Sequence, residues 1–196
     1  PSDALFLPTR SFAKTRYGWA RGLCKRETKA TYVTFRRSLA LRSAPAGAAL
    51  QKLTLSADRR LAEHYAARLS PLDTHLVISQ NLLPHLWQLG VLQGRSFEVL
   101  MERLPLVILQ ARLDEAARLY PQSTTLADFR APSAIVEAET AALALAERFY
   151  TPHAEIAALH PERTDILPWT LPKGPLGRRG GCVVLFPASA LGRKGA

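Results

Sequence analysis

Short apolar runs alternate with segments of helical character along this chain, and this alternation constrains the fold more than any other feature. The runs lack the strict apolar–polar alternation of a strand with one wet face, which favours strands buried on both sides. Such a succession is typical of a parallel sheet with helices on both faces. The sequence therefore predicts an α/β fold with a Rossmann-like, doubly wound parallel sheet. Its expected strands are residues 3–8, 31–35, 75–79, 97–101, 149–151 and 164–167.

The segments between these runs predict helices, through apolar residues at helical spacing or a high alanine content. Residues 36–47 contain Pro45 and Gly47 and are expected to form a loop. Glu137 and Glu139 fall on an alanine-rich helix, where we expect both carboxylates to be solvated. The expected helices are residues 12–26, 53–69, 82–90, 105–120, 132–148 and 152–159.

The last residues of the sequence open a new apolar strand, Cys182 to Pro187, followed by a turn that contains Lys194. A new strand at this point indicates the first strand of a second Rossmann-like lobe whose remainder is missing. We therefore expect a first domain over residues 1–169, an interdomain linker over 170–181, and the truncated start of a second domain over 182–196.

The charge of the chain is strongly basic, with 26 Lys and Arg against 16 Asp and Glu and a net charge of +10. The excess gathers between Arg10 and Arg60 and again between Lys173 and Lys194, which is expected to attract anions. The aromatic residues do not alternate with the basic ones, so a base-reading nucleic-acid protein is disfavoured. Two distant cysteines, Cys24 and Cys182, have no metal-ligand spacing and indicate a cytoplasmic protein.

Candidate site residues follow from the predicted sheet, because ligands of such sheets bind at the carboxyl ends of the strands. Gln80 and Asn81 follow one predicted strand, Glu102 and Arg103 follow the next, and His153 follows a third. A structural role stays open for each of them, most of all for a surface His153. The sequence contains no phosphate-binding glycine loop, no nucleophile elbow and no zinc-protease motif.

The order of segments from Glu139 to Pro187 resembles the junction between the two lobes of GT-B glycosyltransferases of the glycogen synthase-like "group 1" family. In that family a helix with a Glu precedes a strand–turn ending in Pro-Ser, a second strand, a linker and a "G-R-L-x-x-x-K-G" motif. Here Glu147 to His153 takes the place of the strand–turn, Asp165 to Trp169 that of the second strand, and Phe186 to Gly195 that of the last motif. Thr74 to Pro84 is similar to the family's strand that leads into an "L-L-P" helix.

Several positions depart from the family pattern. Ser189 stands where the family has the Arg of the last motif, while Arg193 is shifted by four positions and Lys194 keeps its place. His153 replaces the Ser of the Pro-Ser pair. The His that often follows the fifth strand is missing, and Glu102 and Arg103 stand near its place.

The resemblance implies a retaining transfer of a sugar from a nucleotide-sugar donor to a sugar or lipid-linked acceptor, with no further cofactor and no metal. It places the donor phosphates on Lys194, Ser189 and Arg193. Glu102 and Arg103 become candidate catalytic residues, and Gln80, Asn81 and His153 candidate cleft residues. Because the donor lobe would lie downstream, we expect the chain alone to be inactive.

Two other functions stay open at the level of the sequence. The first is a non-catalytic Rossmann-like module that binds an anionic partner through its basic face. The second is an unrelated α/β enzyme fragment such as a nucleotide-binding hydrolase, which the missing phosphate loop disfavours. The basic segments also leave an anionic membrane surface open as a partner, which would place a cytoplasmic protein at the inner face of the membrane.

Overall fold

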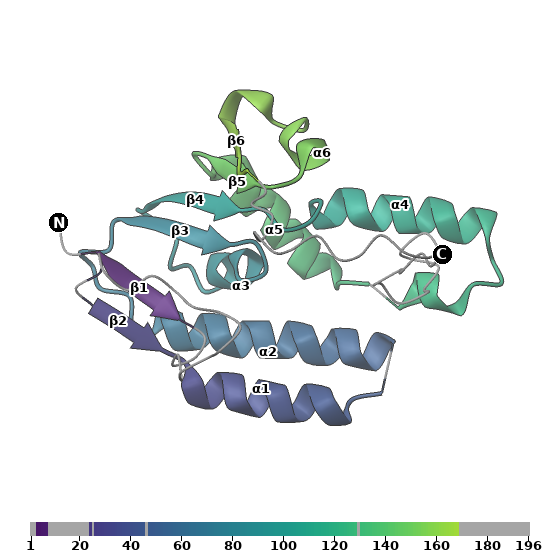
Figure 1. Cartoon of the computed structure of the whole chain (residues 1–196), viewed down its shortest axis with the longest axis horizontal. Helices are drawn as coiled ribbons and strands as arrows, with labels where there is room; N and C mark the ends of the chain where they lie inside the picture. Colours follow the sequence, from purple (N-terminus) through teal and green to yellow (C-terminus); the bar gives the residue numbers. More distant parts are fainter. Residues whose placement is uncertain (1–2, 8–23, 25, 46, 129, 169–196) are drawn as a thin grey trace, which may run out of the picture.

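The computed structural model describes residues 3–7, 24, 26–45, 47–128 and 130–168, and its strands are all paired in parallel (Figure 1). One sheet pairs β1 (Ala4–Leu7) with β2 (Arg26–Lys29). The other has the order β3-β4-β5-β6. The prediction of an α/β fold with a Rossmann-like parallel sheet is confirmed. The four strands of the second sheet are β3 (His75–Ser79), β4 (Ser96–Leu100), β5 (Phe149–Thr151) and β6 (Thr164–Ile166).

Helices connect these strands and pack on one another in a continuous layer. In this layer α3 packs against both α2 and α5, and α1 packs on α2 at the outside of the molecule (Figure 1). None of the described helices is both long enough and apolar enough to cross a membrane. The helices are α1 (Thr31–Ser43), α2 (Ala48–Ala66), α3 (Leu83–Gln88), α4 (Leu106–Leu119), α5 (Ser133–Leu145) and α6 (Ala154–Ala157), with 3-10 turns η1 (Thr124–Ala127) and η2 (Pro161–Arg163).

The main core lies between the second sheet and the helices. Strand register places Ile78, Val99 and Phe149 on the same face of the sheet. These side chains are buried and pack with residues of α2, α3, α5 and α6. On the opposite face Val77 and Leu100 are exposed in the part of the chain that the structure describes. The helices that contribute to this core therefore cover one face of β3 to β6.

The amino-terminal part of the described chain corrects two predictions. Residues 31–35 were expected as a strand and 36–47 as a loop, but Thr31–Ser43 is one continuous helix. The β-branched and aromatic residues that suggested a strand are a weak local preference, which packing of Val33 and Leu41 toward α2 overrides.

The strand that does occur here is β2, whose sequence Arg26-Glu-Thr-Lys29 is polar throughout. All four of its residues are in register with β1, from Arg26 opposite Ala4 to Lys29 opposite Leu7. A search for apolar runs misses such a polar strand. Arg26 therefore lies in a strand and not in the expected helix 12–26. The rest of that helix, apart from Cys24, and the expected elements at 170–181 and 182–196 lie outside the described residues.

Candidate functional site

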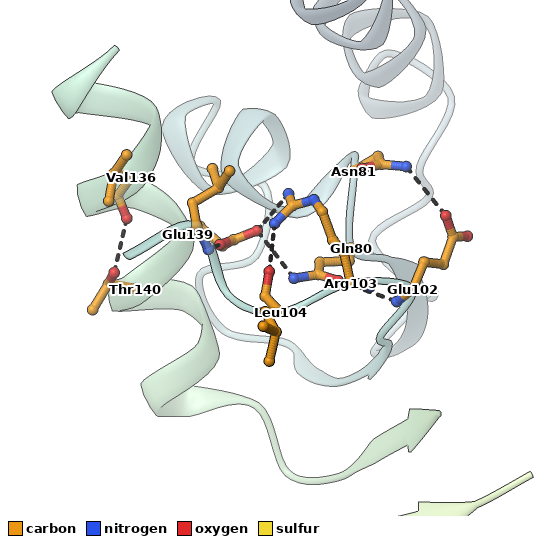
Figure 2. Close-up of polar contacts among 9 residues, drawn as sticks. Gln80, Asn81, Glu102, Arg103, Leu104, Val136, Glu139 and Thr140 are labelled. Carbon is orange, nitrogen blue, oxygen red and sulfur yellow. Dashed lines mark hydrogen bonds and ion pairs between the residues drawn. The ribbon is translucent and has the colours of Figure 1, made fainter. Parts of the chain in front are cut away.

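The carboxyl ends of β3 and β4 lie side by side, because Ser79 is in register with Leu100. The backbone N–H of Gln80 continues the ladder and donates to the carbonyl oxygen of Leu100 at 3.0 Å. The residues that follow the two strands, Gln80 with Asn81 and Glu102 with Arg103, therefore meet at one edge of the sheet, as Figure 2 shows.

Gln80 connects three segments of this edge although its side chain is completely buried, with 0% exposure. Its Oε1 accepts hydrogen bonds from the backbone N–H groups of Glu102 and Arg103, both at 3.1 Å. Its Nε2 donates to Oε1 of Glu139 at 3.3 Å. A buried amide with these partners fixes the path of the chain after β4, because breaking any of these bonds leaves a buried polar group unpaired.

Glu139 of α5 corrects another prediction, because its carboxylate is 1% exposed and not solvated. Its Oε1 also accepts from Nη2 of Arg103 at 2.7 Å (Figure 2). Its Oε2 accepts from the backbone N–H of Leu106. Leu106 is the first residue of α4, so the carboxylate lies at the positive end of that helix.

The sequence does contain a signal that could have identified Glu139 as buried. Glu139 shares one helical face with Ala142, Leu143 and Ala146, at spacings of three, four and seven residues, and all three of these residues are buried. An acidic residue on the apolar face of a helix needs a cationic or N–H partner, which here is provided by Arg103 and Leu106.

Glu102 is held in place by the residues that end and follow β3. Its Oε1 accepts from the hydroxyl of Ser79 at 3.3 Å, and its Oε2 accepts from Nδ2 of Asn81 at 3.2 Å. Two neutral donors orient the carboxylate without neutralising its charge. Arg103, in contrast, is committed to Glu139 through one nitrogen and donates to the carbonyl oxygen of Leu104 through another, at 3.1 Å.

A hollow of about 620 Å³ opens beside these groups, between the ends of β4 and β5. His153, which precedes α6, is exposed at its rim, and its backbone N–H donates to Oγ1 of the buried Thr151 at 3.2 Å. Glu155 also lines the hollow and pairs with Arg112 of α4 at 2.7 Å. The residues that line it are Glu102, Arg103, Leu104, Pro152, His153, Ala154, Glu155 and Ile156.

The structure therefore brings together the candidate residues that it describes. Glu102, Arg103 and His153 line the hollow, while Gln80 and Asn81 hold the first two from the side of β3. Lys194, Ser189 and Arg193 lie outside the described residues. A carboxylate, a guanidinium and an imidazole around an open hollow can bind a polar, hydroxyl-rich ligand. Among the described residues, no group of three His, Cys, Asp or Glu side chains is placed to bind a metal ion.

A second hollow, of about 290 Å³, lies between α1 and α2 and is lined by three arginines, Arg36, Arg37 and Arg60. Arg37 pairs with Oδ1 of Asp58 at 2.5 Å. Burial raises the pKa of the Asp58 carboxyl above its ordinary value, although Arg37 beside it acts in the opposite direction. None of the candidate residues at the strand ends reaches this hollow.

Comparison of the chain with protein-family models, with curated proteins and with solved structures finds no match in any of the three. The class of protein that the structure itself defines is a parallel α/β protein with a polar hollow at the carboxyl ends of its strands. The resemblance to GT-B glycosyltransferases stays a prediction.

Proposed function

We propose that this chain forms the acceptor-side part of an enzyme that transfers a sugar from a nucleotide-sugar donor, and that the hollow beside β4 and β5 receives a saccharide acceptor. The observation that carries the proposal is the pair of donors, Ser79 and Asn81, that hold the Glu102 carboxylate at this hollow. The position agrees with the rule that ligands of parallel sheets bind at the carboxyl ends of the strands.

The chemistry of the hollow suits a saccharide. A carboxylate accepts hydrogen bonds from two neighbouring hydroxyl groups. Arg103 uses two of its five N–H groups for Glu139 and Leu104, and its further N–H groups and the imidazole of His153 can donate to ring and hydroxyl oxygens. In the transfer, the bond between the anomeric carbon and the diphosphate oxygen breaks, and a bond to an acceptor hydroxyl oxygen forms. The electron pair of the broken bond leaves with the diphosphate oxygen. The hydroxyl passes its proton to the carboxylate of Glu102, which we assign to orient it, with His153 as the neighbour of Glu102 at the rim.

The donor side of the proposal depends on residues outside the described part of the chain. Lys194, with Ser189 and Arg193, would bind the donor diphosphate, whose charge grows as the sugar leaves. Replacing Lys194 by Ala is expected to weaken the binding of a UDP- or GDP-sugar by about 1.5–3 kcal/mol if the ammonium makes a charged hydrogen bond to phosphate. Calorimetric titration of both proteins with these nucleotide sugars measures the difference.

Saturation-transfer NMR with a panel of mono- and disaccharides tests the acceptor site. We expect saturation of sugar protons by the wild-type chain and a loss of about tenfold in affinity for Glu102→Gln, because a charged acceptor becomes a neutral amide. Glu115→Gln is the matched control, since Glu115 is an exposed carboxylate on α4 that pairs only with Arg118 in the described chain. A chain that binds none of the saccharides, or whose Glu102→Gln variant binds them equally well, contradicts the proposal.

A further inference from the structure

The outward face of α1 combines large apolar side chains with arginines. Tyr32, Phe35 and Leu39 are 71%, 59% and 49% exposed, and their spacing of three and four residues places them along one side of the helix. Arg36 and Arg42 are exposed on the same side. Helix α1 packs on α2 at the outside of the molecule (Figure 1). Phe35, Leu39 and Arg42 are exposed there, and Tyr32 and Arg36 stand beside them at the border of the hollow between α1 and α2.

The charge of this face is uncompensated within the described structure. The sequence of α1 contains no acidic residue. Residues 31–66 hold six basic and two acidic side chains, and both acidic ones already pair with arginines, Asp58 with Arg37 and Glu63 with Arg59. Arg36 lies over the ring of Tyr32, with its guanidinium carbon 5.9 Å from the ring centre. Neither Arg36 nor Arg42 has an ion pair to an acidic side chain among the described residues.

We infer that this face of α1, formed by Tyr32, Phe35, Arg36, Leu39 and Arg42, binds the surface of an anionic lipid bilayer. A helix in this position lies in the plane of the interface, with its apolar side chains among the upper acyl carbons and its arginines at the phosphates. The long arginine stems can lie along the apolar layer while their charged ends stay in the headgroup region.

Other occupants fit this face less well. A second copy of the chain would bring the two arginines opposite their own counterparts, and like charges at a contact oppose association. A nucleic acid would pair with the arginines and stack bases on the two rings, but it offers no apolar layer for Leu39. A bilayer with acidic headgroups offers an apolar layer to the apolar side chains and phosphates to the arginines. The inference concerns a different part of the molecule from the hollow at the strand ends and does not depend on sugar transfer.

Vesicle binding tests the inference with the full chain. Sedimentation with vesicles of phosphatidylcholine alone, or with about one third phosphatidylglycerol, is expected to show at least about tenfold tighter binding to the anionic vesicles, and weaker binding at high salt. Phe35→Ser with Leu39→Ser is expected to weaken this binding about tenfold or more. Arg36→Gln with Arg42→Gln is expected to abolish the preference for anionic vesicles.

A matched control uses another exposed apolar pair, Leu119→Ser with Tyr120→Ser at the end of α4, which should bind as the wild type does. Circular dichroism and thermal unfolding show whether each variant is folded. Hydrogen exchange of the wild-type chain gives a test free of mutations, because amides of residues 31–43 should gain protection with anionic vesicles.

Several results would overturn the inference. The first is equal binding to neutral and anionic vesicles, or no binding to either kind. The second is full binding by the folded Phe35→Ser, Leu39→Ser variant. A loss in the α4 control as large as that in the α1 variant would also count against it. The last is protection of residues 31–43 by an acidic protein, by RNA or by self-association at higher concentration, with none on anionic vesicles.

Discussion

The two sides of the helical layer differ in which side chains they bury. Around β3, β4 and α5, polar side chains such as Gln80 and Glu139 are buried and each has several partners. In α1, large apolar side chains are exposed and no residue is buried. The first region is closed around a network of hydrogen bonds, whereas the second leaves its large apolar side chains exposed within the described chain.

This difference indicates that the side chains around α5 stabilise the fold, whereas the exposed side chains of α1 do not. Burying a carboxylate is unfavourable unless charged and N–H groups surround it, so the Glu139 network fixes the loop that presents Glu102. Exposing Tyr32, Phe35 and Leu39 gives no stability to the folded chain itself. We therefore expect mutations around α5 to change folding and mutations on α1 to change binding.

The largest contrast should come from one phenylalanine in each region. Phe149→Ala removes a buried ring from the main core and is expected to lower the free energy of unfolding by about 3–5 kcal/mol. Phe35→Ala removes an exposed ring and is expected to change it by no more than about 0.5 kcal/mol. Urea unfolding followed by circular dichroism measures both. If Phe35→Ala costs as much as Phe149→Ala, then α1 packs outward against another part of the chain.

The next contrast uses two glutamates of α5. Glu139→Ala leaves the guanidinium of Arg103, the amide of Gln80 and the N–H of Leu106 without their acceptor, which should cost about 3 kcal/mol. Glu137→Ala, on the exposed side of the same helix, should cost less than about 0.5 kcal/mol. If urea unfolding shows that Glu139→Ala and Glu137→Ala lower the free energy of unfolding equally, the hydrogen bonds of Glu139 do not stabilise the fold.

A smaller effect is expected at Gly47, the N-cap residue that precedes α2, which has a φ of 89°. A Cβ there would lie 3.0 Å from Oδ1 of Asp128, so Gly47→Ala combines backbone strain with a contact and should cost about 1–2 kcal/mol. Gly90 has a φ of 71° and open space around it, so Gly90→Ala carries the backbone strain alone. Thermal unfolding should rank Gly47→Ala as the less stable variant, and the reverse order would show that Asp128 moves aside.

The smallest effect concerns pH. His85 lies on α3 between the two regions, is buried, and has no hydrogen-bond partner for either ring nitrogen among the described residues. Burial, with a contribution from Arg59 and against the effect of Glu63, lowers the pKa of His85 below its ordinary 6.5. Between the folded-state pKa and pH 6.5 the unfolded chain therefore binds more protons than the folded chain. The stability that neutral His85 contributes is present above pH 6.5 and is lost as the pH falls toward the folded-state pKa.

The corresponding slope is at most about 1.4 kcal/mol per pH unit. Urea unfolding of the wild-type chain and of His85→Phe, compared from neutral to mildly acidic pH, isolates this contribution. The difference in stability between the two proteins should shift against the wild type as the pH falls. A constant difference would mean that the imidazole is protonated equally in both states.

Much of the fold could be predicted from the sequence where apolar runs and helical stripes determine the packing. The runs at 75–79 and 97–101 became β3 and β4, and the polar residues after them became the edge of the hollow. Helix α1 was missed because residues 31–35 favour a strand locally and because Pro45 and Gly47 suggested a loop over 36–47, while contacts with α2 make Thr31–Ser43 a helix. The burial of Glu139 could have been predicted from the apolar residues on its helical face, but its partner could not, because Arg103 is 36 positions away in the sequence and only the packing of α5 brings the two together.

The central claim is that the hollow beside Glu102 binds ligand while the face of α1 does not take part. Chemical-shift mapping of backbone amides during titration with a saccharide tests this claim most directly. The account predicts that the shifted amides are those of Asn81, Glu102, Arg103 and His153, with those of residues 31–43 unchanged. Shifts confined to α1 and α2, or no shifts with any saccharide, would contradict it.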